Sequence, residues 1–195
     1  MIQCEVEIKA WLRETPKVAA VRPPTCVACG CASSPVGERL RVHGQGVVAR
    51  QVRGPLSADG RPALVTLAAR KYECQMCGAV MTVVPRGLLR GRQYSGQAIA
   101  LALWLFIVAG LSGVAVRARI SPWAVTGRSG RRGWAQLYRW RTDVRKLFRT
   151  LRPVPEGPPH ESVRRVLLTL VALAPAGLTE LWDEARVFAG AAMIR

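Results

Sequence analysis

The chain has 195 residues, half of them hydrophobic, so it can bury a core and is too apolar to be disordered throughout. Its 29 Lys and Arg against 12 Asp and Glu give a formal net charge of +17, which excludes an acidic protein or a neutral carrier. This excess of positive charge favours a polyanionic partner, either a nucleic acid or an anionic membrane face.

The N-terminal segment, residues 1–23, predicts a short strand and a short helix before Pro23 and Pro24 end any helix. It has early acidic residues and lacks the apolar stretch of a secretory signal. The six cysteines are therefore not expected to form disulfides. Two pairs of cysteines with two residues between them predict a metal site instead.

Residues 24–93 predict a small β domain, because short stretches of mixed alternation are separated by Gly-rich turns. The expected strands are 36–42, 47–52, 64–72 and 80–84, and the expected turns are 43–46 and 57–60.

The metal site is predicted from two Cys-x-x-Cys-Gly motifs. They supply the four thiolates of a tetrahedral zinc site, Cys26, Cys29, Cys74 and Cys77. Two intervening residues let one tight turn present both sulfurs to the ion, and the following glycine tolerates a positive φ. In a zinc ribbon each motif forms the tip of a β-hairpin, and the metal joins the two hairpins. Four thiolates leave no open position, so we expect one structural zinc without a catalytic role.

The ligand set has alternatives. Cys31 creates a second pair with Cys29 and could replace a ligand, and His43 could also bind the metal. A redox role for one Cys-x-x-Cys pair is a further alternative, but the flanking sequence has no thioredoxin-like βαβ pattern.

From residue 94 the hydrophobic period becomes helical, and residues 94–152 predict a helical domain. Ser95 is placed to cap the first helix, and Gly110 is placed to end it. The expected helices are 96–109, 112–120 and 134–151, the last of them amphipathic.

One stretch of this domain, residues 98–116, is uncharged, mostly apolar and flanked by Arg. It is long enough for a membrane span, so a membrane-associated protein is an alternative interpretation. Gly110, Ser112 and Gly113 divide the stretch, which favours two buried helices instead.

Residues 111–125 match the pattern of a helix-turn-helix motif. Ala115 provides the small residue that the motif requires, and Ser121 and Pro122 predict the start of a recognition helix. The apolar positions of the motif are occupied by Val114, Ala118, Ile120 and Val125. A recognition helix at Pro122 would present its first residues to base edges in the major groove.

Positive charge concentrates around this motif, because residues 117–152 contain eleven basic side chains and a single acid, Asp143. Such a cluster predicts contacts with phosphates. The expected nucleic-acid-binding residues are Arg117, Arg119, Ser121, Trp123, Thr126, Arg128, Arg131, Arg132, Arg139 and Arg145. The alternative is a solvated Arg face with most of the tryptophans in the core.

The C-terminal part begins with a Pro-rich linker, residues 153–160. Two apolar helices are expected at about 161–174 and 178–190. We expect the helical tail, residues 161–195, to serve docking or dimerisation, the alternative being that it packs back onto the preceding domain.

The order of these features resembles the zinc-ribbon plus helix-turn-helix module at the N-terminus of bacterial insertion-sequence transposases. It is also similar to small transposon-associated zinc-ribbon proteins of unknown function. The resemblance covers about residues 24–150. Besides the two cysteine motifs it is carried by His43-Gly44, Val83-Val84-Pro85, Tyr94-Ser95 and Leu111-Ser112. It implies binding to the terminal DNA of a mobile element. The acidic nuclease domain of such transposases is not expected, because the tail is too short to hold it.

These observations predict an α+β fold, with a β zinc ribbon, a helix-turn-helix domain and a C-terminal helical pair. We expect a non-enzymatic, sequence-preferring protein that binds double-stranded DNA, as an accessory subunit or regulator of a transposase or recombinase. Its expected partners are DNA, that catalytic protein and, through the tail, a second copy. The expected location is cytoplasmic and nucleoid-associated. A non-specific nucleic-acid scaffold in a larger complex is the alternative.

Overall fold

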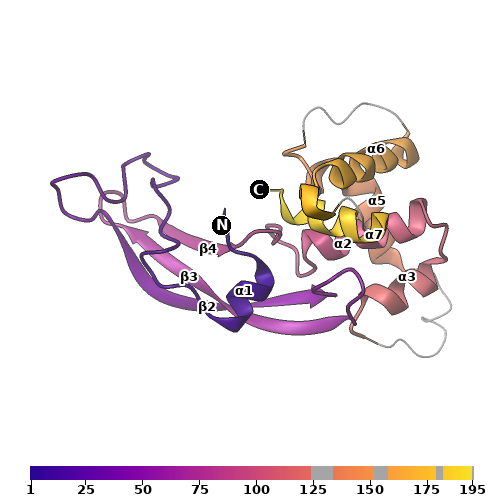
Figure 1. The fold of residues 1–195 in the computed structure, drawn as a ribbon. Helices are drawn as coiled ribbons and strands as arrows, with labels where there is room; N and C mark the ends of the chain where they lie inside the picture. Colours follow the sequence, from indigo (N-terminus) through magenta and orange to yellow (C-terminus); the bar gives the residue numbers. More distant parts are fainter. Residues whose placement is uncertain (124–133, 152–157, 179–181, 195) are drawn as a thin grey trace.

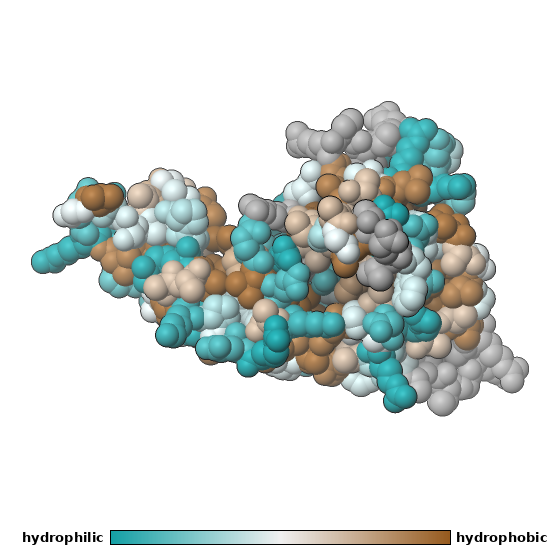
Figure 2. Space-filling model, viewed as in Figure 1, coloured by the Kyte–Doolittle hydropathy of each residue, from teal (hydrophilic) through white to brown (hydrophobic). Residues whose placement is uncertain are grey.

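The structure is a computed structural model that describes residues 1–123, 134–151, 158–178 and 182–194. It confirms the α+β class. Figure 1 shows a long β arm at one end of the molecule and a body of helices at the other. The surface is hollowed between the arm and the body (Figure 2).

The arm is built on a four-stranded mixed sheet with the strand order β1-β4-β3-β2. Its strands are β1 (Ile2–Cys4), β2 (Val42–Gly54), β3 (Ala63–Cys74) and β4 (Val80–Pro85). β1 pairs with β4 in parallel, whereas the other two pairings are antiparallel. The N-terminal segment is therefore part of the sheet and not separate from it.

The long β2–β3 hairpin differs from the expected pattern of short strands. The turn expected at 43–46 is a bulge inside β2, where the register shifts between Gly44 and Val47. Gly46 has a φ of +93°, which lets the strand take up extra residues and then resume its pairing. The strand expected at 36–42 does not form, and its last residue begins β2. The turn expected at 57–60 is confirmed, because the Gly60 amide donates to the Ser57 carbonyl.

One short helix, α1 (Ile8–Arg13), packs on the sheet. Trp11 is 1% exposed, and its indole Nε1 donates to the Ala68 carbonyl at 2.9 Å. The Tyr72 hydroxyl donates to the Val18 carbonyl at 2.7 Å, which anchors the segment after the helix. The first residues of the chain thus complete the core of the arm.

The central helix of the body, α2 (Gly96–Ile107), explains the uncharged stretch of the sequence. Every residue from Ala98 to Leu105 is buried, because neighbouring helices cover the helix on all sides. Ser95 caps it as expected, accepting a hydrogen bond from the Ala98 amide. Among the described residues no helix is long and apolar enough to cross a membrane. The stretch 98–116 is divided between α2 and a second helix, as the glycines predict.

The other helices of the body surround α2. They are α3 (Gly113–Ile120), α5 (Ala135–Leu147), α6 (Pro159–Ala172), the 3-10 turn η1 (Ala176–Leu178) and α7 (Asp183–Ala192). Val163 and Leu167 of α6 and Val187 of α7 belong to the same buried cluster as α2. The apolar faces of the tail are therefore used inside the chain, and a docking or dimerisation role stays a prediction about its outer side.

α6 and α7 cross at very close range. A Cβ atom placed on Gly190 of α7 would lie 1.8 Å from the carbonyl oxygen of Leu170 on α6. Only glycine fits at this crossing, and the two helices therefore hold each other against α2.

The end of β2 joins the arm to the body. The Arg53 amide donates to the Gln93 carbonyl at 2.8 Å. The Arg53 guanidinium lies 5.6 Å from the centre of the Trp123 ring. Beside it, Gly54 with a φ of +106° lies against Ala98 of α2, where a Cβ would come within 2.5 Å of the Ala98 Cβ. The strand thus ends directly on the central helix.

Candidate metal centre and basic surface

The two Cys-x-x-Cys-Gly motifs adopt the same backbone turn. The Gly30 amide donates to the Cys26 carbonyl at 2.9 Å, and the Gly78 amide donates to the Cys74 carbonyl at 2.8 Å. The two glycines have φ values of +74° and +70°, as expected for the residue after such a turn. The second turn joins β3 to β4 at the tip of a hairpin. The first turn lies outside the named strands and is flanked by an isolated bridge between Thr25 and Ala32.

Folding brings the four predicted ligand sulfurs together. The Sγ atoms of Cys26 and Cys77 are 3.7 Å apart, and those of Cys29 and Cys74 are 3.8 Å apart. All four lie within 4.8 Å of one another. Four thiolates at about 2.3 Å from a tetrahedral zinc have sulfur–sulfur distances of about 3.8 Å. The four cysteines therefore form a group that can hold a metal ion.

Cys31 lies beside this group and not in it. The Cys26 amide donates to the Cys31 carbonyl, and in the other motif the Cys74 amide donates to the Ala79 carbonyl. Cys31 thus occupies the position that Ala79 has in the second motif, one residue after the glycine that ends the shared turn. Its Sγ is 3.5 Å from that of Cys74, yet the cluster of mutually close ligand atoms among the described residues does not include it.

His43 also lies outside the group. It is exposed on β2, and its Nε2 is 2.8 Å from the Leu40 carbonyl, with which it shares a hydrogen bond. The structure thus favours the set of four cysteines predicted from the spacing.

Among the thiols of the group, those of Cys74 and Cys77 have displaced pKa values. Burial raises the pKa of the Cys74 thiol, but the amides of Met76 and Cys77 and the neighbouring thiols oppose this and bring it to about 6. The pKa of the Cys77 thiol is raised to about 12, although the Ala79 amide lowers it, because Cys29 and the other thiols accept its proton in hydrogen bonds and burial disfavours its charge. Sulfurs packed this closely share protons, and a cation replaces those protons when it binds.

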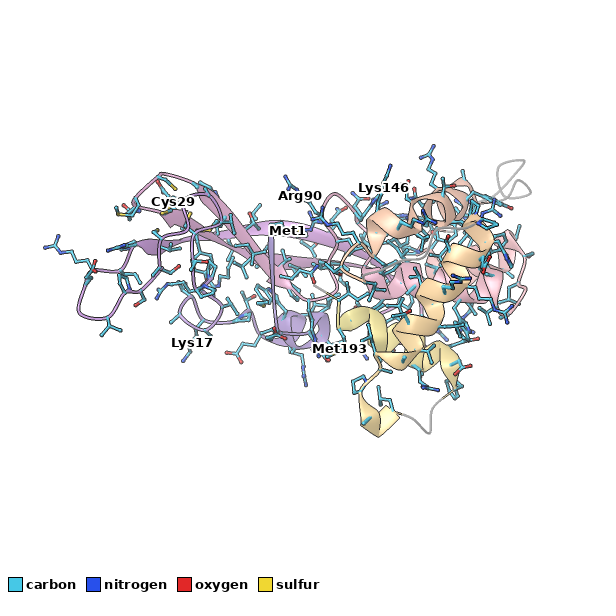
Figure 3. The ribbon with its side chains drawn as sticks, turned by 90° about the horizontal axis from the view of Figure 1, so that it is seen from above. Met1, Lys17, Cys29, Arg90, Lys146 and Met193 are labelled. Carbon is cyan, nitrogen blue, oxygen red and sulfur yellow. The ribbon has the colours of Figure 1, made fainter. Side chains whose placement is uncertain are left out.

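Neighbouring hydrogen bonds hold the two motifs against each other. Ser33, which is buried after the first motif, donates from its hydroxyl to the Pro23 carbonyl at 2.5 Å. The Gln75 amide in the second motif donates to the Arg41 carbonyl at 2.8 Å, just before β2 begins. Figure 3 places Cys29 near the free end of the arm, far from the helical body.

The predicted nucleic-acid-binding residues fall into three groups. Four are exposed, namely Arg119, Trp123, Arg139 and Arg145. Arg117 is half-buried and Ser121 is buried. The remaining four, Thr126, Arg128, Arg131 and Arg132, lie outside the described residues, as does most of the expected recognition helix.

The expected contact of Ser121 with a base stays a prediction, and in the structure the side chain of Ser121 faces inward. It is 7% exposed, and its Oγ accepts hydrogen bonds at 3.3 Å from the Tyr94 hydroxyl and from the Trp123 amide. The hydroxyl that was expected to meet a base shapes the turn instead. Ser121 is the C-cap residue of α3, and its amide donates to the Arg117 carbonyl at 2.8 Å.

The predicted burial pattern of the helix-turn-helix is wrong within α3. Val114 is 50% exposed and Ala118 is exposed, whereas Val116 and Ile120 are fully buried. The helix begins after the Ser112 cap, and this start turns a different face toward α2 than the motif requires. Ile120 is one of the expected apolar positions that is confirmed.

Two of the exposed arginines are partly used within the body. Arg119 donates to the Ala58 carbonyl at 3.4 Å and lies 3.8 Å from the Glu184 carboxylate. Arg145 donates to the Ser162 hydroxyl at 3.1 Å, which ties α5 to α6.

α5 separates its apolar and basic residues most clearly. Leu137, Trp140 and Val144 are buried against α2 and α6. Trp140 stacks edge-on with Tyr94 and Trp134, each at a centroid distance of 5.0 Å. Two of the three tryptophans near the motif are therefore core residues, and of these three only Trp123 is exposed. The exposed side of α5 carries Arg139, Arg145 and Lys146, and Arg141 is half-buried at the edge of the apolar face.

Sequence reasoning missed the basic residues of the turn before α2. Arg90, Gly91 and Arg92 lie outside the stretch of highest charge, so charge density alone does not single them out. The signal was the Arg-Gly-Arg spacing, because glycine at the third position of a tight turn displays the flanking side chains.

Comparisons with protein-family models, with curated proteins and with solved structures find no match for this chain.

Proposed function

We propose that this chain is a zinc-containing protein that binds double-stranded DNA through the basic side of its helical body. The observation that carries the proposal is the outward face of α5. Its basic residues point away from a core of Leu137, Trp140 and Val144. The single acid of the helix, Asp143, is already bound by Arg92 at 3.2 Å. The positive charge of this face is therefore not neutralised by its own helix.

The charge balance of the whole chain supports the same proposal. Six acidic side chains form ion pairs with arginines among the described residues. Each pair joins one acid to one arginine, so with 29 basic residues against 12 acids the pairs leave the large positive excess unchanged. A protein with this excess attracts phosphate backbones over distances near the Debye length.

Zinc is the proposed metal because four thiolates at tetrahedral spacing are its preferred structural donor set. The metal would join the turn at residues 26–30 to the β3–β4 hairpin and hold the free end of the arm. Four protein ligands leave no position for a reacting water, so we propose a structural role.

Sequence preference is proposed to come from the segment that begins at Pro122. Trp123, 49% exposed and held under Arg53, marks where that segment leaves the described body. The resemblance to transposase modules supports a role as accessory subunit or regulator of a mobile-element transposase or recombinase. The proposal includes no nuclease site in this chain. The role therefore needs a partner protein that catalyses the DNA cleavage.

The experiment is a binding titration with duplex DNA across a salt series. The wild-type chain is compared on the ends of the encoding mobile element and on random duplex. If about six basic residues contact phosphates, log affinity falls with log salt with a slope of about −5. Preference for the ends by at least tenfold supports the proposal, and equal, weak binding to both duplexes favours the non-specific scaffold.

A matched pair of variants locates the binding face. Arg139→Ala removes an exposed arginine from α5, and Arg164→Ala removes an exposed arginine from α6. Both change the net charge equally. Loss of about one unit of salt slope in the first variant alone supports the α5 face, whereas equal loss in both contradicts it.

A further inference from the structure

A cleft between the arm and the body combines basic residues from two separate parts of the chain. Its volume is about 540 Å³. Its basic residues are Arg90 and Arg92 from the turn before α2, Lys146 from the last turn of α5, and Arg149 just after α5. Acidic side chains do not line this cleft among the described residues. Figure 3 shows Arg90 and Lys146 on the same side of the molecule.

The turn that forms one wall is held rigidly. The Arg92 amide donates to the Leu89 carbonyl, and Gly91 at the third position has a φ of +70°, the geometry of a type II turn. The Arg50 guanidinium on β2 donates to the Leu89 carbonyl at 3.2 Å and to the Arg92 carbonyl at 2.9 Å. One arginine of the arm thus fixes both ends of the turn that displays Arg90.

The base of the cleft is fixed from the other side. The Gly87 amide donates to the Gln3 Oε1 at 2.9 Å, and the Gly96 amide donates to the Gly87 carbonyl at 2.7 Å. β1 and the start of α2 therefore hold the segment that leads into the turn. Such preorganisation lowers the entropy cost of gathering cations around an anion.

The wall of the cleft that faces the turn is formed by the end of α5, and its basic residues have no acidic partner in the cleft. Lys146 and Arg149 are exposed side chains that line the cleft together with the turn, and the described lining contains no carboxylate. Asp143, the one acid nearby on α5, is bound to Arg92 and neutralises only that residue. Three cations therefore remain around a concave surface.

We propose that this cleft is a phosphate-binding site, in which Arg90 on one wall and Lys146 and Arg149 on the other hold the phosphate between them. Arg and Lys are the side chains that bind phosphate, Arg through its planar fork and Lys as a point charge. The phosphate comes either from a nucleic-acid backbone or from a small free phosphate. The first source rests on the proposed function and extends the DNA contact from the α5 face to the arm.

The test uses two doubly substituted variants of the full chain. Lys146→Ala with Arg149→Ala removes one wall. Arg13→Ala with Lys17→Ala removes the same charge from exposed residues at the end of α1 and just beyond it. Figure 3 places Lys17 on the side opposite Arg90. Arg90→Ala tests the other wall, and thermal unfolding confirms that each variant is folded.

With duplex DNA as the probe, loss of the wall should reduce the salt slope by about 2, and Arg90→Ala by about 1. The α1 double variant should keep the wild-type slope. The cleft proposal is overturned if the wild type binds DNA tightly, both double variants have the same salt slope, and inorganic phosphate does not bind in the cleft. The proposed function would still stand in that case.

A calorimetric titration with inorganic phosphate tests the second source, a small free phosphate. If the wild type ignores DNA but binds phosphate, and only the cleft variants lose it, the cleft is a free-phosphate site and the DNA function fails. If the wild type binds neither probe, both proposals fail.

Discussion

The arm and the helical body are stabilised in different ways. The core cluster of the body has 26 buried residues among those described, and they include eight consecutive residues of α2, 98–105. The arm has 14, and two of these are the cysteines Cys26 and Cys74. Small hydrophobic cores need additional cross-links to be stable. We therefore expect the arm to depend on a metal ion held by its four cysteines in a way that the body does not.

The largest effect is expected from Cys74→Ser. A structural zinc in small domains contributes on the order of 10 kcal/mol or more of folding free energy. We expect the variant to lose its metal and the protection of arm amides from hydrogen exchange, while amides of α2 stay protected. Cys4→Ser, which changes a cysteine of β1 outside the group, should retain the metal. Unchanged protection of the arm in the metal-free variant would contradict this division.

The reverse experiment removes a core residue of the body. Leu101 is fully buried in the middle of α2, and Leu101→Ala should cost roughly 2–5 kcal/mol. Chemical unfolding followed by helical circular dichroism measures the loss. Metal content is measured at the same time and should stay at one ion per chain. Release of the metal together with the helices would show that arm and body unfold as one unit.

A smaller effect is expected at the turn of the second motif. Gly78 has a φ of +70° with open space around its Cβ position, so Gly78→Ala introduces only backbone strain, of about 1–2 kcal/mol. Metal affinity should therefore fall by roughly tenfold in a competition titration. Gly177→Ala in η1, also with open space but without a positive φ, should leave it unchanged. Equal affinities in both variants would count against the shared turn geometry.

The smallest effect is expected at a helix cap. Ser95→Ala removes the hydroxyl that accepts from the Ala98 amide, which should cost about 1 kcal/mol. The loss should appear as a lower melting temperature of the body alone. Ser112→Ala, at the more exposed cap of α3, provides a comparison. A shift in metal affinity with either variant would blur the distinction between the two regions.

Local patterns predicted the parts of this structure that local chemistry decides. The cysteine spacing identified the four cysteines whose sulfurs meet in the fold, and the Ser95 cap and the break at Gly110 placed α2. The β2 bulge was missed because the Gly-rich segment 43–46 has the composition of a turn. A bulge can be recognised there only when the pairing strand is known. β3 supplies that partner, and only the fold reveals it.

The helix-turn-helix register failed for a similar reason. Val114 and Val116 are equally apolar, so composition cannot decide which of them faces α2. The start of α3 after Ser112 decides it, and Val116 is buried. The cleft at Arg90 likewise forms because β1, the turn and the end of α5 meet in space. These segments lie far apart in the sequence, so a local sequence pattern cannot predict the cleft.

Strand β2 also sets a length. It begins beside the metal-binding turns and ends on α2, and at about 3.3 Å per residue its 13 residues span roughly 40 Å. A straight duplex rises about 3.4 Å per base pair, so it would need about 12 base pairs to reach from one end of this strand to the other. If the proposed DNA binding holds, an oligonucleotide shorter than one helical turn that lies along this strand would contact the body or the tip of the arm, but not both at once.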